Sequence, residues 1–282
     1  MIDTDRRNLV LMALLSPLSA AATANTKAIS SATGEPYVYA PDSVAHWTGD
    51  EQIGMLIYPG MTIMDLIGPQ SMFASLMGAK IYLVAKSLDP VTSDADVTIL
   101  PTATFDTCPR DLTVLFTPGG TDGTLAAASD PDTLAFMADR GARAKYITSV
   151  CSGSLVLGAA GLLDGYKATS HWSCRDALSG FGAIPIDARV VRDRNRFTGA
   201  GVTAGLDFAL AMVAELRSRF YAECTQLMAE YDPQPPFNAG SVKTAPAKVV
   251  ADMTHLLEDF TTKVDELVAA TAKKGLPIQR IG

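Results

Sequence analysis

The segment Tyr146-Ile-Thr-Ser-Val-Cys-Ser-Gly-Ser-Leu-Val-Leu-Gly-Ala-Ala160 reads as a buried strand followed by a helix. Its first five residues form a short apolar run, which is typical of a strand buried on both faces. A helix is predicted from Ser154 to about Ala160. Cys151 therefore falls on a turn between a strand and a helix, a position from which a side chain can project beyond the edge of a sheet.

Four apolar runs that precede this segment are also predicted to be strands. They are Gln52–Tyr58, Lys80–Ala85, Val97–Leu100 and Leu112–Thr117. Apolar residues at helical spacing predict helices over Thr62–Met77 and Pro131–Ala144, between and after these strands. Strands that alternate with helices indicate an α/β fold with a mostly parallel sheet covered on both faces.

Three chemically distinctive sites lie at the ends of predicted strands. Asp65 follows the first strand, Gly119 and Gly120 follow the fourth, and Cys151 follows the fifth. Parallel sheets bind ligands beyond the carboxyl ends of their strands. We therefore expect these residues to lie close together at one edge of the sheet.

The second half of the chain predicts a hairpin and two long helices. The hairpin, Ala188–Thr198, carries four arginines, and such a run of charges is more often an exposed ribbon than a binding site. Thr203–Tyr231 is predicted to be one helix, and Pro246–Lys274 a final amphipathic helix. We expect the final helix to pack on the main domain, with a contact between two subunits as the alternative.

The composition argues against several classes of function. The formal net charge is −7 and the pI about 5.0, so the chain has no electrostatic reason to bind nucleic acid or an anionic membrane. The four cysteines contain no Cys-x-x-Cys pair, and the three histidines are far apart. We therefore expect no metal site.

The N-terminus resembles an export signal. Arg6 and Arg7 precede a short apolar run from Leu9, and an Ala-x-Ala site follows near Ala24, as in a twin-arginine signal. Residues 1–24 are therefore predicted to direct the protein to the periplasm, and residues 25–50 to form a linker. The alternatives are a core helix at the start of the domain and a cytoplasmic protein.

The turn at Cys151 suits a nucleophile. Unpaired N–H groups and the positive end of the helix dipole should favour the thiolate. The N–H of Ser152 and one N–H from Gly119 or Gly120 could form an oxyanion hole. The alternative is that Cys151 is a small buried apolar side chain, as most free cysteines are.

Asp65 is the candidate acid. A carboxyl group among the apolar neighbours Thr-Ile-Met and Leu-Ile-Gly has a raised pKa if it is buried, and can then exchange protons near neutral pH. Its alternative role is to cap the helix that begins nearby.

Several motifs in order resemble the ThiJ/PfpI superfamily, and most closely its isonitrile hydratase group. They are Tyr58-Pro-Gly-Met-Thr, Asp65-Leu-Ile-Gly-Pro, Thr117-Pro-Gly-Gly, Ser149-Val-Cys-Ser-Gly-Ser-Leu-Val-Leu-Gly-Ala-Ala-Gly-Leu-Leu, Thr169-Ser-His-Trp, Gly199-Ala-Gly-Val-Thr-Ala-Gly-Leu-Asp and Tyr231-Asp-Pro-Gln-Pro-Pro-Phe. The resemblance covers roughly residues 52–240. It implies a flavodoxin-like three-layer sandwich, as in class I glutamine amidotransferases, within a domain at 51–240 that precedes a helical extension at 241–282. It also implies a homodimer without metal or organic cofactor.

The same resemblance implies roles for particular residues. Cys151 is the nucleophile and Asp65 the acid in the hydration of a small apolar isonitrile to an N-substituted formamide. Ser152 stands where the isonitrile hydratases often have threonine. His171 falls where the superfamily often places a histidine near the nucleophile, although a structural role is equally expected. Trp172, with Ile63 and Leu66, is a candidate for the apolar wall of the substrate site.

Two other functions remain open on the sequence. One is another thiol reaction of the superfamily, of the glyoxalase, deglycase or amidase type. The other is a non-catalytic sensor that responds to a ligand or to oxidation of Cys151.

Overall fold

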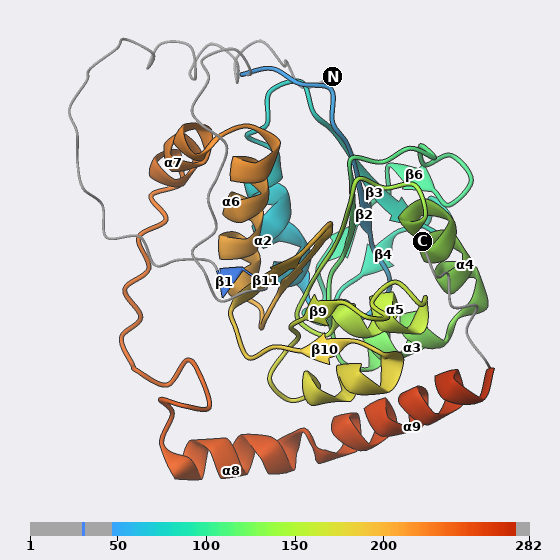
Figure 1. The fold of residues 1–282 in the computed structure, drawn as a ribbon, viewed down its shortest axis with the longest axis vertical. Helices are drawn as coiled ribbons and strands as arrows, with labels where there is room; N and C mark the ends of the chain where they lie inside the picture. The colour runs from blue at the N-terminus through green and yellow to red at the C-terminus, as the bar shows by residue number, and fades with distance from the viewer. Residues whose placement is uncertain (1–29, 32–46, 275–282) are drawn as a thin grey trace.

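The computed structural model of the chain describes residues 30–31 and 47–274 (Figure 1). The predicted export signal at 1–24 and most of the predicted linker at 25–50 lie outside the described residues. Among the helices of the described residues, none combines the length and the apolar composition that a membrane-spanning segment needs.

A mostly parallel sheet forms the centre of the molecule. In the described ranges it has eight strands in the order β1-β11-β12-β8-β7-β2-β3-β6. Its strands are β1 (Ser30–Ser31), β2 (Gln52–Leu56), β3 (Lys80–Ala85), β6 (Ala103–Thr104), β7 (Val114–Thr117), β8 (Tyr146–Val150), β11 (Val190–Asp193) and β12 (Arg196–Gly199). Neighbouring strands run parallel except β11 and β12, which form an antiparallel hairpin.

Helices cover both faces of this sheet (Figure 1). One face carries α2 (Ile63–Phe73), α6 (Ala204–Leu216) and α7 (Arg219–Met228). The other carries α3 (Asp122–Ser129), α4 (Pro131–Gly141), α5 (Gly153–Ala159) and the 3₁₀ helix η1 (Asp176–Phe181). Apolar side chains from the sheet and both helix layers make a continuous core. The predicted three-layer, flavodoxin-like α/β fold is confirmed.

One predicted strand does not join the main sheet. In the segment Val97–Leu100 only Thr98–Ile99 is extended, as β5, and it pairs antiparallel with β4 (Val91–Thr92) in a separate small sheet. Its flanking residues Val97 and Leu100 are exposed rather than buried. Another two-stranded sheet pairs β9 (Lys167–Ala168) with β10 (Ile184–Pro185).

The arginine hairpin is present, and its arginines differ in exposure: Arg189 and Arg194 are exposed as predicted, whereas Arg196 is not. β12 pairs with β8 inside the main sheet, which draws Arg196 into a buried position. The Arg196 Nε donates to the Leu162 carbonyl at 2.6 Å, and the guanidinium lies over the ring of Tyr166. The expectation of a solvated face was wrong for this residue because the sheet continues through the hairpin.

Both predicted long helices are broken. The helix expected over Thr203–Tyr231 ends at Leu216, and α7 starts again after Ser218, whose side-chain oxygen accepts the Tyr221 N–H as an N-cap. The helix expected over Pro246–Lys274 divides at Leu257 into α8 (Ala247–Leu256) and α9 (Glu258–Lys274).

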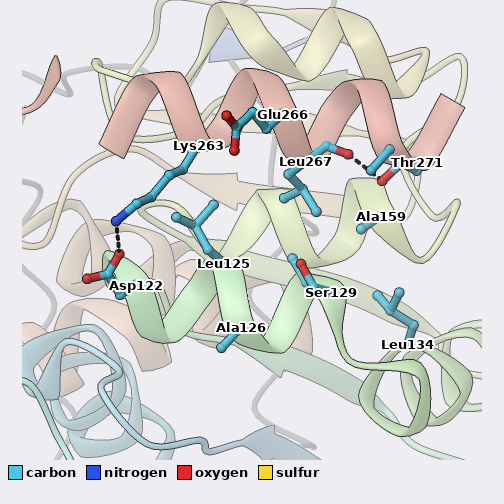
Figure 2. A pocket seen from close by; sticks show the side chains of 12 residues that line it. Asp122, Leu125, Ala126, Ser129, Leu134, Ala159, Lys263, Glu266, Leu267 and Thr271 are labelled. Atoms are coloured by element: carbon cyan, nitrogen blue, oxygen red, sulfur yellow. Dashed lines mark hydrogen bonds and ion pairs between the residues drawn. The ribbon is translucent and has the colours of Figure 1, made fainter. Parts of the chain in front are cut away.

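The helix α9 packs on the domain, whereas α8 has no buried residue. Phe260, Val264 and Leu267 of α9 are buried, and α9 contacts α3 and η1. A cavity of about 510 Å³ lies along this contact, where Leu125 of α3 faces Leu267 and Lys263 reaches Asp122 at 3.2 Å (Figure 2). Its lining is drawn from α3, α4, α5 and α9, and includes neither Cys151 nor Asp65.

Candidate functional site

Cys151 lies between β8 and α5, on the turn that the sequence predicts. Its φ is +56°, in the left-handed region that residues other than glycine seldom adopt. The Cys151 N–H donates to the carbonyls of Gly199 and Ala200, at 3.1 and 2.7 Å, which are the last residue of β12 and the residue after it. Backbone strain of this kind persists only where the surrounding structure holds it, and it is concentrated at functional sites. The hairpin therefore fixes the turn that presents the thiol.

Asp65 lies in the first turn of α2 and is completely buried. Its Oδ2 accepts the Gly119 N–H at 2.9 Å, and its Oδ1 has no partner of good hydrogen-bonding geometry within the described residues. Burial raises the pKa of this carboxyl to about 7, while the Gly119 N–H and the Cys151 thiol act in the opposite direction. A carboxyl with this pKa is present in both protonation states at neutral pH.

Asp65 does not cap the helix. That role belongs to Asp94, whose carboxylate accepts the Ile63 N–H at 3.2 Å and the Thr62 hydroxyl at 2.7 Å. The alternative role for Asp65 is thereby wrong. Its side chain is turned to the interior, where it faces Cys151 across the edge of the sheet.

The Cys151 thiol is not predisposed to ionise. Burial raises its pKa well above the ordinary value, and the charge of Asp65 and the sulfur of Cys174 add to this effect. A hydrogen bond from the Ser152 N–H to the sulfur lowers the pKa but does not compensate. Burial therefore opposes the thiolate that the helix N-terminus is expected to favour.

The N–H groups of Gly119 and Gly120 are both occupied. The Gly119 N–H is held by Asp65, and the Gly120 N–H donates to the Ser152 hydroxyl oxygen at 3.0 Å. The Ser152 hydroxyl in turn donates to the Gly120 carbonyl. The structure therefore differs from the expected oxyanion hole, since these groups position Asp65 and Ser152 instead of facing open space.

The close approach at Gly119 leads to a prediction. A Cβ at this position would lie 2.7 Å from the nitrogen and hydroxyl oxygen of Ser152 and 2.8 Å from Asp65 Oδ2. We expect Gly119→Ala to lower kcat/KM about a hundredfold, because it displaces the carboxyl and the turn, and to lower stability by about 1–3 kcal/mol. Gly240→Ala is the matched control, because a Cβ there has no neighbour within 4 Å. Unchanged kinetics in Gly119→Ala would show that the close packing is not needed.

His171 and Trp172 form a pair beside the turn. The His171 Nδ1 lies 2.8 Å from the Ser173 hydroxyl, and its ring centroid is 5.5 Å from that of Trp172. Burial lowers the pKa of His171, so the imidazole is neutral at pH 7. Within residues 47–274 the structure gives His171 no hydrogen bond to Cys151 or Asp65, which favours the structural role for it.

Three residues near Cys151 were not foreseen as members of the site. Cys174 is buried, and its sulfur lies 3.2 Å from the Ser170 hydroxyl, which also donates to the Cys151 carbonyl at 3.0 Å. Thr124 lies 3.2 Å from the Ser152 hydroxyl. Thr124 lies in the first turn of α3 and Ser170 lies within the Thr169-Ser-His-Trp motif, but neither residue type by itself indicates a site in the sequence.

Metal ligands do not gather at this site. Across the described ranges, no group of three or more histidine, cysteine, aspartate or glutamate side chains is placed to hold a metal ion.

Comparisons with known proteins agree with the geometry. The model of the DJ-1/PfpI family matches residues 51–215. Isonitrile hydratase of Pseudomonas putida is 50% identical over 199 residues, which are 71% of this chain and 86% of that protein. A crystal structure of a ThiJ/PfpI family protein from Pseudomonas syringae is 80% identical, with a TM-score of 0.78 over 79% of this chain and 92% of that one.

A more distant relative is a regulator. The HTH-type transcriptional regulator GbdR of Pseudomonas aeruginosa is 26% identical over 82% of this chain, but the chain spans only 62% of the regulator's length. The resemblance drawn from the motifs is confirmed by the family match and by the 50% identical relative. The chain belongs to the DJ-1/PfpI family.

Proposed function

We propose that this protein hydrates an isonitrile to an N-substituted formamide, with Cys151 as the nucleophile and Asp65 as its proton-transfer partner. The observation that carries the proposal is a buried carboxyl with a pKa of about 7 beside a thiol on a strained strand-to-helix turn. The 50% identity to the isonitrile hydratase of Pseudomonas putida supports the substrate class.

The first step joins sulfur to the terminal carbon of the isonitrile. Because the thiol holds its proton at neutral pH, Asp65 in its carboxylate form accepts that proton as the sulfur attacks. Asp65 then gives the same proton to the carbon. The product of this step is a thioimidate, R–N=CH–S–Cys151. The thiol proton is now on the carbon, and Asp65 is again a carboxylate.

The second step adds water. Asp65, again ionised, accepts a proton from a water molecule that attacks the thioimidate carbon, and passes this proton to the nitrogen. The carbon–sulfur bond then breaks as the new hydroxyl group gives its proton, through Asp65, to the departing sulfur, and R–NH–CHO is released with Asp65 again ionised. The sum is the addition of one water molecule to the isonitrile.

The substituent R is proposed to be compact and apolar. Ile63 is half-buried, and Met64 and Ile67 are exposed, so the part of α2 that carries Asp65 presents apolar side chains at the surface. Trp172 is half-buried and accessible to a ligand. Leu66 is completely buried in the core and is not part of an open wall.

A direct assay tests this proposal. We expect the purified protein to convert cyclohexyl isocyanide to N-cyclohexylformamide, followed by ¹H NMR, and to leave methylglyoxal unchanged under the same conditions. Consumption of methylglyoxal without isonitrile turnover would instead favour the glyoxalase or deglycase reaction. A protein that is inactive on both but forms a sulfinic acid at Cys151 with dilute peroxide would favour a sensor.

Assembly and location are further proposals. A homodimer follows from the family resemblance, and a periplasmic location follows from the twin-arginine-like pattern at residues 1–24, with a cytoplasmic protein as the alternative. Both stay predictions.

A further inference from the structure

A chain of buried hydroxyl groups runs behind the Cys151–Asp65 pair. The Tyr58 hydroxyl, at the end of the segment that contains β2, donates to the Pro118 carbonyl at 2.6 Å and lies 3.0 Å from the Thr124 hydroxyl. Thr124 on α3 lies 3.2 Å from the Ser152 hydroxyl, which is bonded to both backbone groups of Gly120. All of these side chains are buried.

Thr124 lies between the Tyr58 and Ser152 hydroxyl groups, and it must be the donor of the hydrogen bond that links it to either of them. The Tyr58 hydroxyl gives its proton to Pro118, and the Ser152 hydroxyl gives its proton to Gly120. Each therefore faces Thr124 as an acceptor. A single threonine hydroxyl can donate to only one of these oxygens at a time, so a valine in its place would remove one hydrogen bond from this network.

These hydroxyl groups position the loop Pro118–Gly120, and this loop in turn positions Asp65. Pro118 and Gly120 are fixed by Tyr58 and Ser152, and between them Gly119 directs its N–H to Asp65 Oδ2 at 2.9 Å. This N–H stabilises the ionised carboxyl, which is the form that accepts the thiol proton in the proposed reaction. A shift of the loop would weaken the bond.

We propose that Thr124 is a positioning residue for the reaction, acting through the Pro118–Gly120 loop to set the ionisation of Asp65. The inference rests on the proposed function, in which Asp65 must be ionised to accept the proton of Cys151. Thr124 itself touches neither of these side chains among the contacts that the structure records, so its effect is indirect.

The test compares three variants by their pH dependence. Thr124→Val removes the hydroxyl with little change of volume, and Thr124→Ser keeps it. Thr225→Val is the matched control, because Thr225 is also buried and its hydroxyl also contacts a serine hydroxyl, that of Ser75 at 3.0 Å, where α7 meets the end of α2. The readouts are the acid limb of kcat/KM for an isonitrile and the ¹³C titration of the Asp65 carboxyl, assigned with Asp65→Asn.

We expect both readouts to move upward by about half a pH unit or more in Thr124→Val, because the Gly119 N–H bond that stabilises the carboxylate is weakened. Thr124→Ser and Thr225→Val should titrate like the wild type, even if Thr225→Val is less stable. An unchanged limb and titration in Thr124→Val, or an equal shift in Thr225→Val, would overturn the proposal. The carboxyl titration needs no turnover, so it still decides the role of Thr124 if the wild type proves inactive on isonitriles.

Discussion

Cys151→Ala should lower kcat/KM for an isonitrile by roughly a thousandfold or more. The variant keeps the turn and the buried carboxyl but has no atom that can bond to the isonitrile carbon. The loss is therefore expected in kcat as well as in kcat/KM, measured by formation of the formamide. Because Cys151 is almost completely buried and alanine is smaller, we expect the fold to survive.

Cys224→Ala is the matched control for this prediction. Cys224 is a free cysteine on α7, only partly buried, and belongs to none of the contacts described around Cys151. It should retain the activity of the wild type. Equal activity in Cys151→Ala and Cys224→Ala would eliminate covalent catalysis by Cys151.

Asp65→Asn should make the protein less active and, above neutral pH, more stable. The amide cannot accept the thiol proton, so kcat/KM should fall by roughly 10²–10⁴-fold. The stability effect follows from the raised pKa: the carboxyl has a pKa of 3.8 in the unfolded chain and about 7 in the folded one. Between these values the folded state binds more protons, so stability falls as pH rises from about 4 to about 7.

The substitution removes this penalty. At pH 8 the ionised, buried carboxyl lowers the free energy of unfolding of the wild type by up to about 4 kcal/mol. This value follows from the pKa difference, at about 1.4 kcal/mol for each pK unit. At pH 4 or below the two proteins should differ little. Urea unfolding of both proteins at pH 4 and pH 8 measures the difference. A variant less stable than the wild type at pH 8 would mean that the carboxylate is better solvated than its burial indicates.

The fold was predictable from the sequence where local signals are strong. Lys80–Ala85 and Tyr146–Val150 form strands with the predicted bounds, because each is an apolar run with β-branched residues between clear boundaries. The place of Cys151 at the end of one of them followed directly. The break between α6 and α7 was harder to predict from the sequence, since the apolar pattern continues across it and only the cap at Ser218 marks the start of α7.

The electrostatics of the site were not predictable from sequence in the same way. A helix N-terminus next to Cys151 suggests a thiolate, but the degree of burial that reverses this appears only when the layers are assembled. The engagement of the Gly119 and Gly120 N–H groups likewise depends on side chains 54 and 32 positions away along the chain. The raised pKa of Asp65 was predicted on the condition that the carboxyl is buried, and the fold meets this condition because the side chain is completely buried.

In the proposed reaction, the Cys151 sulfur forms a covalent bond with the isonitrile carbon. The most direct measurement is peptide mapping by mass spectrometry of protein quenched with acid at successive times during a single turnover of cyclohexyl isocyanide. We predict that the peptide containing Cys151 transiently gains the mass of the isonitrile and that the formamide appears as this adduct decays. An adduct on a different side chain, or complete conversion with the Cys151 thiol free at every time point, would contradict the account.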